Sequence, residues 1–494
     1  MTEQGRSHPI DEDSSPDRSK RCGTARTADC IDRHTAWTRS RTSATELAGV
    51  RWLRTTLGSM LSLSLLFSTL LLERGFTRRS ALGSVGAGLV GALGITTAAA
   101  SDPEPDDEPG GDRYVVGLEP GTSTASVSRT ASRLYRSLDR SPAGSAIVGD
   151  FDDDARRALK ERSDVRYVER DYVRRQSVAT VDASESVDLV DEQRTPWGVE
   201  RIGATDFHGS DSAGSGATVA ILDSGIDPEH ESLEVADGEA FIECDEDVCA
   251  TAWDDETGHG THCAGTVAAL DNGRGVVGAA PAVGLCALKV LAGDGSGYDS
   301  DIAAAIEWCA DNEIDVINLS LGGSDEAQVL EDALRYAYDN GVLIVAAAGN
   351  DGSVGGIDYP AGYDECIAVG STDERDAVPS WSARGEGIEL VAPGEDVLST
   401  MPDDEYVYLE GTSMSTPHVA AIGAKLMSQG LPNAEDTDDV DDPGGARAVL
   451  RETAEDIGFD DDEQGYGLLD AFTAFEELEP VTTEDVTDVR THSA

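Results

Sequence analysis

The stretch DDETGHGTHCAGTVAAL, residues 254–270, holds His259, His262 and Cys263 within five positions. Three kinds of chemistry use such residues: a metal cluster, a thiol nucleophile beside a base, or one catalytic histidine among structural neighbours. Zinc is the weakest of the three, because the sequence has no second pair of ligands at metal-binding spacing. The stretch alone does not decide between the other two, so the remaining polar residues of the chain matter.

Three further polar residues stand where apolar segments begin or end. Asp223 ends the run VAILD, Asn350 ends VLIVAAAGN, and Ser413 lies in GTSMSTPHVA, just before an apolar helix. Backbone N–H groups at the start of a helix can stabilise an oxyanion, although a serine there can also be a simple N-cap. Pro417 fits such a helix only within its first turn. Together with a histidine, these residue types meet the requirement of a Ser-His-Asp triad.

The elements that would position these residues are short apolar runs separated by helix-like segments. Runs that are buried on both faces and alternate with helices indicate a doubly wound parallel sheet, an α/β fold. Functional side chains in such a sheet lie at the carboxyl ends of strands, where Asp223 and Asn350 are found. The predicted strands lie within residues 218–225, 285–291, 316–321, 341–350, 366–371 and 388–394, and the helices within 300–312 and 325–340.

The chain is strongly acidic, and its charge is unevenly distributed. Its 494 residues hold 37 Lys+Arg and 95 Asp+Glu, a formal net charge of -58. Residues 112–176 hold 13 basic and 11 acidic side chains, whereas residues 177–494 hold 11 basic and 70 acidic ones. Self-repulsion of this size destabilises a compact state in dilute buffer, but at roughly 1 M salt the Debye length falls to about 3 Å. We therefore expect a surface suited to strong brine, and no binding of nucleic acid.

The front of the chain contains a predicted export signal. Residues 77–100 combine the pair Arg78 and Arg79, a run of small and apolar residues, and three alanines, as in a twin-arginine signal with an A-x-A cleavage site. The acidic linker 101–111 follows, which favours export over a membrane anchor. An export signal normally begins a protein, yet residues 1–76 precede this one. Either a true start further downstream or a long cleaved leader would explain them.

Residues 112–176 have the pattern of a small α+β domain. We expect strands in RYVVGL, SAIVGDF and VRYVERDYV, and helices in TASRLYRSL (130–138) and DDARRALKER (153–162). This order approaches the split βαβ, ferredoxin-like arrangement.

Four motifs in order, AILDSGID, GHGTHCAGTVAAL, AAAGN and GTSMSTPHVA, closely resemble those of the subtilisin-like serine proteases, or subtilases. The resemblance extends almost continuously over residues 193–475. The acidic, lysine-poor composition and the export signal resemble the halolysin branch from haloarchaea. The resemblance implies a serine endopeptidase domain at 193–478, followed by a short acidic tail at 479–494, with no catalytic cofactor.

Matched to these motifs, His259 is the general base that takes the Ser413 proton and returns it to the leaving amine. Asp223 holds the other imidazole nitrogen, and Asn350 joins the Ser413 backbone N–H in stabilising the oxyanion. The resemblance also makes His262 a structural residue.

The resemblance further makes Cys263 a buried free cysteine close behind the base. Cys286, Cys309 and Cys366 lie in apolar segments and are also expected to be buried thiols. Cys244 and Cys249, in a polar loop, form the most plausible disulfide.

Two segments of the chain resemble the edges that clamp an extended peptide by backbone pairing, where glycines allow a second backbone to approach. Asp351 and Asp358 flank the loop that walls the S1 pocket. Acids there would favour a basic P1 residue, but in so acidic a domain chance placement is the better interpretation. The clamping residues are Gly295, Ser296, Gly297, Ser320, Leu321 and Gly322.

A structural calcium site is implied by the same resemblance. The position of the family's aspartate ligand is Ser232 here, and the neighbouring Glu231 would have to compensate. Oxygen ligands suit calcium. The residues of this site are Gln193, Leu270, Asn272, Arg274 and Val276, three of them through backbone carbonyls.

The family resemblance makes residues 112–176 an inhibitory propeptide that is cut from the peptidase within 177–192. The partners of the peptidase are then protein and peptide substrates and its own propeptide. We expect the enzyme to be a secreted monomer. Two other functions stay open: a membrane-anchored processing subtilase, and a non-catalytic binding protein with the subtilase fold. Five propeptide arginines are expected to face the acidic domain: Arg133, Arg136, Arg156, Arg157 and Arg166.

Overall fold

The computed structural model describes residues 113–478, apart from 141–143, 178–185, 188, 190–191, 209–212, 243–250, 353–355, 434–443 and 477. The expectations for residues 1–111, for the tail 479–494, for most of the processing region and for the Cys244–Cys249 disulfide lie outside the described residues. Within the described part of the chain, no helix has the length and apolar character needed to cross a membrane.

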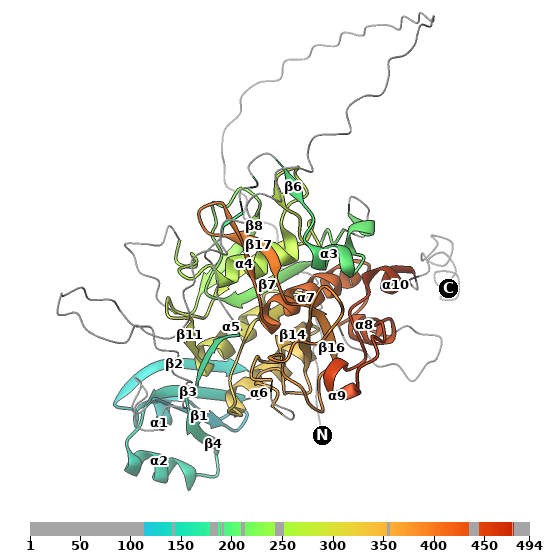
Figure 1. Cartoon of the computed structure of the whole chain (residues 1–494). Helices are drawn as coiled ribbons and strands as arrows, with labels where there is room; N and C mark the ends of the chain where they lie inside the picture. The colour runs from blue at the N-terminus through green and yellow to red at the C-terminus, as the bar shows by residue number, and fades with distance from the viewer. Residues whose placement is uncertain are drawn as a thin grey trace, which may run out of the picture. The chain divides into compact units, whose positions relative to one another are not determined.

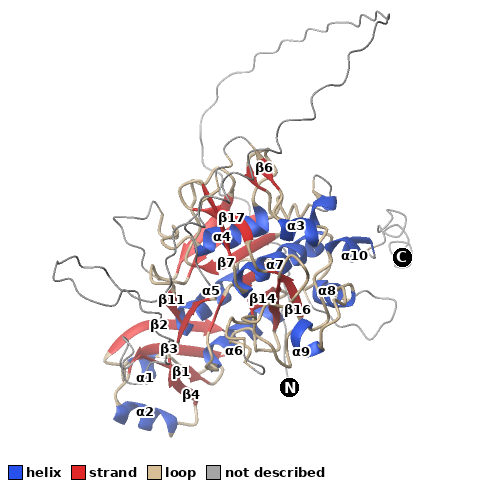
Figure 2. Cartoon of the chain, viewed as in Figure 1, coloured by secondary structure: helices blue, strands red, loops and turns tan. Residues whose placement is uncertain are grey.

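The centre of the large domain is a seven-stranded parallel sheet with helices on both sides (Figure 2). This confirms the doubly wound α/β fold. Six of the strands fall within the apolar runs; the seventh, β8, is an edge strand whose half-exposed side chains left no apolar run. In spatial order the strands are β16 (Leu390–Pro393), β15 (Cys366–Thr372), β14 (Leu343–Ala347), β12 (Val316–Leu319), β7 (Thr218–Asp223), β10 (Gly284–Lys289) and β8 (Val235–Ala240).

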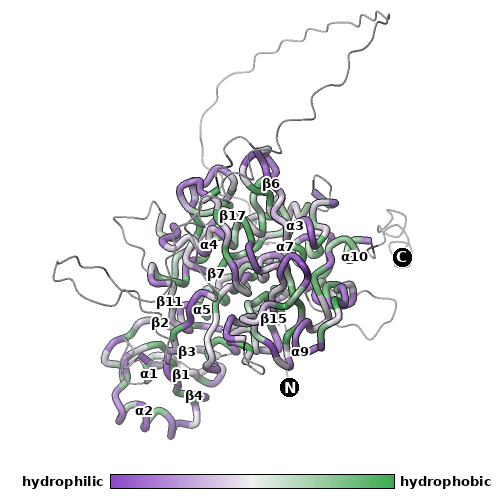
Figure 3. The backbone as a smooth tube through the Cα atoms, viewed as in Figure 1, coloured by the Kyte–Doolittle hydropathy of each residue, from purple (hydrophilic) through white to green (hydrophobic). Residues whose placement is uncertain are grey.

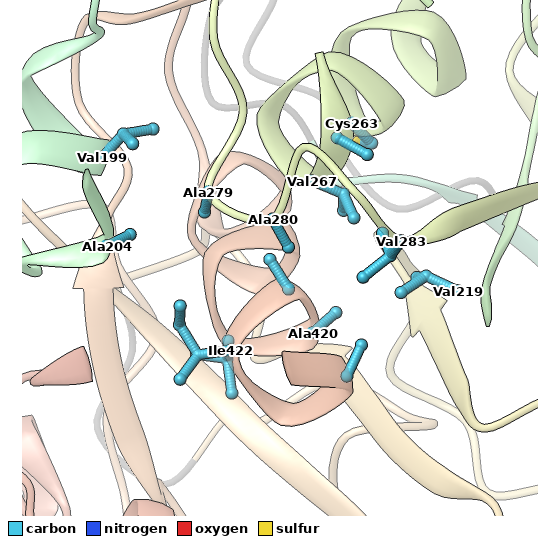
Figure 4. Close-up of a cluster of buried hydrophobic side chains, with 14 of the residues drawn as sticks. Val199, Ala204, Val219, Cys263, Val267, Ala279, Ala280, Val283, Ala420 and Ile422 are labelled. Carbon is cyan, nitrogen blue, oxygen red and sulfur yellow. The ribbon is translucent and has the colours of Figure 1, made fainter. Parts of the chain in front are cut away.

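Alternate side chains of the interior strand β7 point to different cores, because successive strand residues face opposite sides of a sheet. Val219 packs with α4 (His259–Ala268) and α7 (Thr412–Ser428) in the larger core, part of which Figure 4 shows. Leu222 packs on the other side with α5 (Asp299–Asp311) and α6 (Gln328–Asp339).

The strand order reverses between β7 and β12. From β7 the chain first forms the edge strand β8 and then β10 between β8 and β7, after which it crosses to build β12, β14, β15 and β16 on the other side. Such a switch point opens a crevice at the carboxyl ends of the two strands, where ligands bind in open α/β sheets. Asp223 ends β7 at this place, and Ser320 follows β12.

Shorter elements surround the sheet (Figure 1). They are β6 (Gln193–Arg194), α3 (Trp197–Arg201), the 3-10 helix η1 (Ala204–Phe207), β9 (Gly275–Val276), β17 (Val397–Met401), β18 (Glu405–Leu409), α8 (Ala446–Glu452), α9 (Asp461–Gln464) and α10 (Ala471–Glu476).

Residues 113–170 form a separate four-stranded antiparallel sheet in the order β2-β3-β1-β4, with two helices. The element order is βαββαβ, and α2 is largely hydrophilic (Figure 3). Asp152 caps α2 by accepting from the Ala155 N–H at 2.8 Å. The elements are β1 (Arg113–Leu118), α1 (Ala125–Ser128), β2 (Arg133–Arg140), β3 (Gly144–Asp150), α2 (Asp153–Lys160) and β4 (Val165–Arg170).

The helix expected at 130–138 is wrong, because most of this segment belongs to strand β2. Leu138 and Arg140 are buried and Arg136 is half-buried, whereas Ser137 and Asp139 between them are exposed, which is the alternation of a strand. Arg140 is buried because it pairs with Glu307 of the large domain. A search for alternating apolar residues does not count a buried arginine as an inward-facing position, so the strand pattern of this segment was not recognised.

After β4 the chain enters the large domain as an extended strand, β5 (Val173–Gln176). This strand lies between β11 (Ser296–Tyr298) and β13 (Leu321–Gly322) in a three-stranded antiparallel sheet. A segment that precedes the large domain therefore completes a sheet within it.

Candidate active site

His259 and Asp223 form the centre of the crevice at the switch point. His259 is the first residue of α4, and its Nδ1 lies 2.8 Å from Asp223 Oδ1, with both side chains buried. The same carboxylate oxygen accepts from the Ser224 N–H at 2.7 Å and from the Ser224 hydroxyl at 3.1 Å. These donors fix the carboxylate, and the carboxylate in turn orients the imidazole.

The loop before α4 is built on Asp255, a residue that the sequence analysis did not single out. Its Oδ1 accepts from the N–H of Gly258 at 2.9 Å, and its Oδ2 accepts from the N–H of Thr261 at 2.9 Å. Gly258 has φ 85°, the left-handed region that favours glycine. The spacing D-x-x-G before the histidine was the available signal for a side-chain cap that positions His259.

Ser413 is the second residue of α7, which begins directly after Gly411. Its Oγ donates to the Ser320 carbonyl at 2.9 Å, whereas His259 Nε2 has no hydrogen-bond partner among the described residues. The serine hydroxyl is thus turned toward the Ser320 carbonyl and not bonded to the histidine, and helix α4 contacts the start of α7 through the Cys263 thiol, which donates to the Ser413 carbonyl at 3.6 Å.

Pro417 lies in the second turn of α7, so its expected placement in the first turn is wrong. A proline at this position removes the N–H that would bond to the Ser413 carbonyl. That carbonyl accepts instead from the Ser320 hydroxyl at 2.9 Å and from the Cys263 thiol at 3.6 Å. Neighbouring elements supply the missing donors, which is why the helix tolerates the proline.

Asn350 lies beside the start of α7. Its Oδ1 accepts from the N–H of Thr412 at 2.9 Å and from the Thr412 hydroxyl at 3.1 Å. These two bonds set the rotation of the amide and leave Nδ2 as a donor. Since Thr412 precedes Ser413, the Asn350 amide and the first N–H groups of α7 can serve the same oxyanion.

The contacts of His262 lie elsewhere, whereas the Cys263 thiol donates to the Ser413 carbonyl. His262 Nε2 lies 3.1 Å from the Val397 carbonyl and 3.3 Å from the Val407 carbonyl, and burial lowers the pKa of His262 to about 3. Its ring is therefore neutral and joins α4 to β17 and β18.

Asp223, His259 and Cys263 also place one potential metal ligand each within 4.8 Å of one another. Burial, and then the Asp223 carboxylate, raise the pKa of the Cys263 thiol well above its ordinary value. A thiol ligand or nucleophile must be deprotonated. The cluster therefore suits acid–base chemistry by the histidine better than metal or thiol chemistry. As expected from the sequence, Cys263, Cys286, Cys309 and Cys366 are buried and free.

The six residues expected to clamp a peptide lie on both sides of β5. Gly297 pairs with Arg174 and Ser296 with Arg175 on one side, while Leu321 pairs with Gln176 on the other. At the end of the strand, the N–H of Ser177 donates to the Ser320 carbonyl at 3.2 Å.

The glycines in these edges leave room for backbone contact. A Cβ on Gly297 would lie 2.1 Å from the carbonyl oxygen of Val290, which belongs to the large domain itself and not to β5. On the β5 side, the N–H of Gln176 donates to the Gly295 carbonyl at 3.1 Å. An extended chain thus occupies the groove and ends beside the nucleophile candidate. Asp358 lies against Gly322 on the same wall, and burial raises the pKa of Asp358 to about 6.

The proposed calcium residues lie together, but four of their expected ligand oxygens already accept hydrogen bonds from the protein, including Gln193 Oε1 from the Gly273 N–H at 3.0 Å. Gln193 Nε2 donates to the Leu270 carbonyl at 2.7 Å and is 3.4 Å from that of Val276, and Asn272 Oδ1 accepts from the Arg274 N–H at 3.0 Å.

The acidic residue expected to compensate, Glu231, instead pairs with the Arg274 guanidinium at 3.4 Å. Ser232 Oγ lies 2.7 Å from the Tyr406 hydroxyl. A calcium site normally offers carboxylate oxygens, and here the expected one is committed to a cation. The residues as arranged fit calcium poorly, and the site stays a prediction.

Comparison with known proteins identifies the class to which this fold and crevice belong. The pattern of the subtilase family, peptidase S8, matches residues 214–467. Subtilisin Savinase of Lederbergia lenta is 42% identical over 282 residues, which cover 57% of this chain and 99% of that protein. Subtilisin E of Bacillus subtilis (strain 168) is 36% identical over 327 residues, covering 64% of this chain and 80% of that protein.

M-protease of Shouchella clausii (strain KSM-K16) is also 42% identical over 282 residues, 57% of this chain and 70% of that protein. The chain belongs to the subtilase family, and the expectation of a subtilisin-like serine endopeptidase is confirmed. Assignment to the haloarchaeal branch stays a prediction.

Proposed function

We propose that the chain is a secreted, salt-requiring serine endopeptidase that is made as a zymogen and frees itself from its own N-terminal segment. One observation carries the proposal: β5 lies between the two predicted clamping edges, and Ser177 at its end shares the Ser320 carbonyl with Ser413 Oγ. A peptide substrate presents the same backbone groups as β5, and so would pair with the same edges.

The reaction begins when Ser413 Oγ leaves the Ser320 carbonyl and attacks the carbonyl carbon of the substrate. Its proton passes to His259 Nε2, and Asp223 stabilises the imidazolium through Nδ1. His259 then protonates the leaving amine, and water hydrolyses the acyl-enzyme by the same route in reverse. The Ser413 N–H and Asn350 Nδ2 donate to the oxyanion that forms at each addition step.

We assign residues 112–176 to an inhibitory propeptide, 177–192 to the processing region and 193–478 to the peptidase. Three observations support this assignment: the small sheet is complete by itself, the next strand of the chain, β5, lies between the two clamping edges, and ion pairs join the small sheet to α5 and α6. Arg136 lies 2.9 Å from Asp301, and Arg166 lies 2.7 Å from Asp332. The propeptide is then both substrate and inhibitor of its own peptidase.

We also propose export by the twin-arginine signal at 77–100 and function as a monomer in concentrated salt. The support is the arginine pair and small-residue end of that segment, and the net charge of -58. Strong salt screens repulsion between acidic side chains, so the compact state should be most stable there.

The proposal is tested with the chain expressed in about 2–4 M salt, beside a Ser413→Ala variant. We expect a fluorophosphonate probe to label Ser413 of the wild type, and N-terminal sequencing of the secreted form to place the cut within 177–192. The variant should be exported folded and keep residues 112–176.

Each contrary outcome identifies another function. A wild type that folds but takes no label would be a non-catalytic binding protein. Recovery in the membrane fraction would show an anchored protease. Normal maturation of the Ser413→Ala variant would show that another protease does the processing.

A further inference from the structure

The side chain of Arg174 lies in a closed site beside the substrate groove. It is 1% exposed, and the Asp299 carboxylate that receives it is 0% exposed. Arg174 Nε donates to Asp299 Oδ1 at 2.6 Å, and its Nη2 donates to Asp299 Oδ2 at 2.9 Å and to the Asp325 carbonyl at 2.6 Å. The guanidinium thus makes a two-pronged contact with one carboxylate and a third bond to the backbone.

The position of this site relative to the nucleophile follows from the strand register. The Ser177 N–H and Ser413 Oγ both donate to the Ser320 carbonyl, so the carbonyl of Ser177 is the substrate-like group next to the nucleophile. Arg174 lies three residues before Ser177 in the same strand. The site therefore receives the fourth residue on the N-terminal side of the bond that Ser413 would cut.

The acidic half of the site belongs to the peptidase and remains when the propeptide leaves. Asp299 is the first residue of α5, and its N–H donates to the Tyr172 carbonyl at 2.9 Å. In the full chain this carboxylate is buried with Arg174 against it, and departure of Arg174 removes its opposite charge. Burial raises the pKa of Asp299 to about 7, and Arg174 counteracts that rise. The emptied site should therefore bind another cation of the same shape.

The walls of the site suit arginine better than lysine or an apolar side chain. A planar guanidinium offers parallel N–H groups that match both oxygens of a carboxylate, whereas an ammonium is a point charge. Gly323 leaves room for the group, because a Cβ there would lie 3.1 Å from Arg174 Nη1. Arg175, the next residue of β5, is exposed, so the selection acts on a single position.

We propose that Asp299 and the Asp325 carbonyl form an arginine-recognition site that selects substrates with arginine four residues before the cleaved bond. The inference rests on the proposed function, because it assigns a substrate preference to that same groove. It makes the enzyme selective for a basic sequence, with the segment Val173–Gln176 and Ser177 as its first example.

The experiment uses internally quenched peptides with the sequence VRRQSVAT of residues 173–180 and the mature wild-type enzyme in about 3 M salt. Replacing the first arginine by citrulline keeps its shape and removes its charge; methionine removes both charge and hydrogen bonds. We expect kcat/KM to fall about 10- to 100-fold for either peptide, as for loss of charge-assisted hydrogen bonds. The same changes at the second arginine, which matches exposed Arg175, should alter kcat/KM less than about threefold.

The matched enzyme variant is Asp299→Asn, with Asp311→Asn at the far end of α5 as control. Because Asp299→Asn alone would leave Arg174 buried against an amide, it is made together with Arg174→Gln in the full chain. The matured Asp299→Asn enzyme should cleave the arginine and citrulline peptides at similar rates. Asp311→Asn should keep the full preference.

Equal cleavage of the arginine, citrulline and methionine peptides by the wild type would overturn the inference while leaving the proposed peptidase intact. So would an Asp299→Asn enzyme that keeps the preference. If the double variant fails to mature, the wild-type peptide comparison still decides. Failure of every peptide together with no fluorophosphonate label would instead show that the proposed function is wrong.

Discussion

At the residue scale, hydrogen bonds hold the side-chain amide of Asn350 in one orientation. Two bonds from Thr412 to its Oδ1, at 2.9 and 3.1 Å, fix the amide plane and leave Nδ2 free to donate. Such an amide interacts more strongly with the oxyanion of the transition state than with the carbonyl of the bound substrate. Its contribution should therefore appear in the rate of the chemical step.

We expect Asn350→Ala to lower kcat by about 10²–10³-fold and to leave KM within about twofold. The measurement is steady-state hydrolysis of a peptide substrate in about 3 M salt, with circular dichroism as the control for folding. A raised KM with unchanged kcat would show that the amide binds the ground state instead.

Two histidines three positions apart differ in what surrounds them. His259 contacts a carboxylate and has Nε2 without a partner, whereas His262 is surrounded by backbone carbonyls of β17 and β18. His259→Ala should lower kcat by at least about 10⁴-fold, and His262→Asn by less than about tenfold. Two folded variants that are equally inactive would contradict these roles.

At the scale of elements, the small domain that we propose as a propeptide caps a helix of the large domain. Glu169 of β4 accepts from the N–H groups of Gln328 at 3.0 Å and of Val329 at 2.9 Å, at the start of α6. These bonds satisfy two donors that the helix cannot satisfy itself. Burial raises the pKa of Glu169 to about 7, because its effect is larger than that of the two hydrogen bonds, which lower this pKa.

This pKa predicts how propeptide binding depends on pH. In the released propeptide Glu169 is expected to titrate near the ordinary value of about 4.3, so between that pH and about 7 the complex holds a proton that the free form lacks. Lower pH in this window therefore favours the complex, and rising pH weakens it.

We expect the inhibition constant of the released propeptide to rise by up to about 75-fold between about pH 5 and pH 8, the factor that one proton gives when its pKa changes from about 4.3 to about 7. Glu169→Gln, which cannot titrate, should flatten the profile. The measurement is inhibition of the mature enzyme across this range at constant salt. An unchanged slope in the variant would assign the effect to other interface acids, such as Asp171, whose pKa burial also raises.

At the scale of the whole molecule, ion pairs join the acidic large domain to the arginine-rich segment that we propose as its propeptide. Of the five arginines expected at the interface, Arg136 and Arg166 pair with Asp301 and Asp332. Arg156 and Arg157 instead pair with acids of their own helix, so that part of the expectation is wrong.

The remaining one, Arg133, stacks on Tyr135 within the small domain. Arg113 and Arg140, which the sequence analysis did not select, make interface pairs with Asp301 and Glu307. Both come from the face of the small sheet that meets α5, whereas helix α2 lies apart from that contact.

We expect salt to slow propeptide association while it stabilises the enzyme, because it screens both attraction and self-repulsion. The measurement is the association rate of propeptide with mature enzyme at about 1.5 and 4 M salt. Because the Debye length is already below about 3 Å, the decrease should be modest, within about threefold. A rate that is flat or rises with salt would mean that hydrophobic packing controls inhibition.

The sequence by itself determined the features that depend on neighbouring residues. Apolar runs predicted six strands of the parallel sheet, and Asp223, His259, Asn350 and Ser413 could be named because each stands in a local motif at the end of an element. Burial on both faces leaves a strong local pattern, and catalytic residues must occupy strand and helix ends.

The tertiary structure alone decided the features that join distant parts of the chain. Strand β2 was mistaken for a helix because its buried face carries arginines, whose partners lie more than 160 residues away in sequence. Arg174 and Asp299 are 125 residues apart, and nothing near either one indicates that they form a closed pair. A buried charge is stable only beside an opposite charge, and the tertiary structure determines which distant residue supplies it.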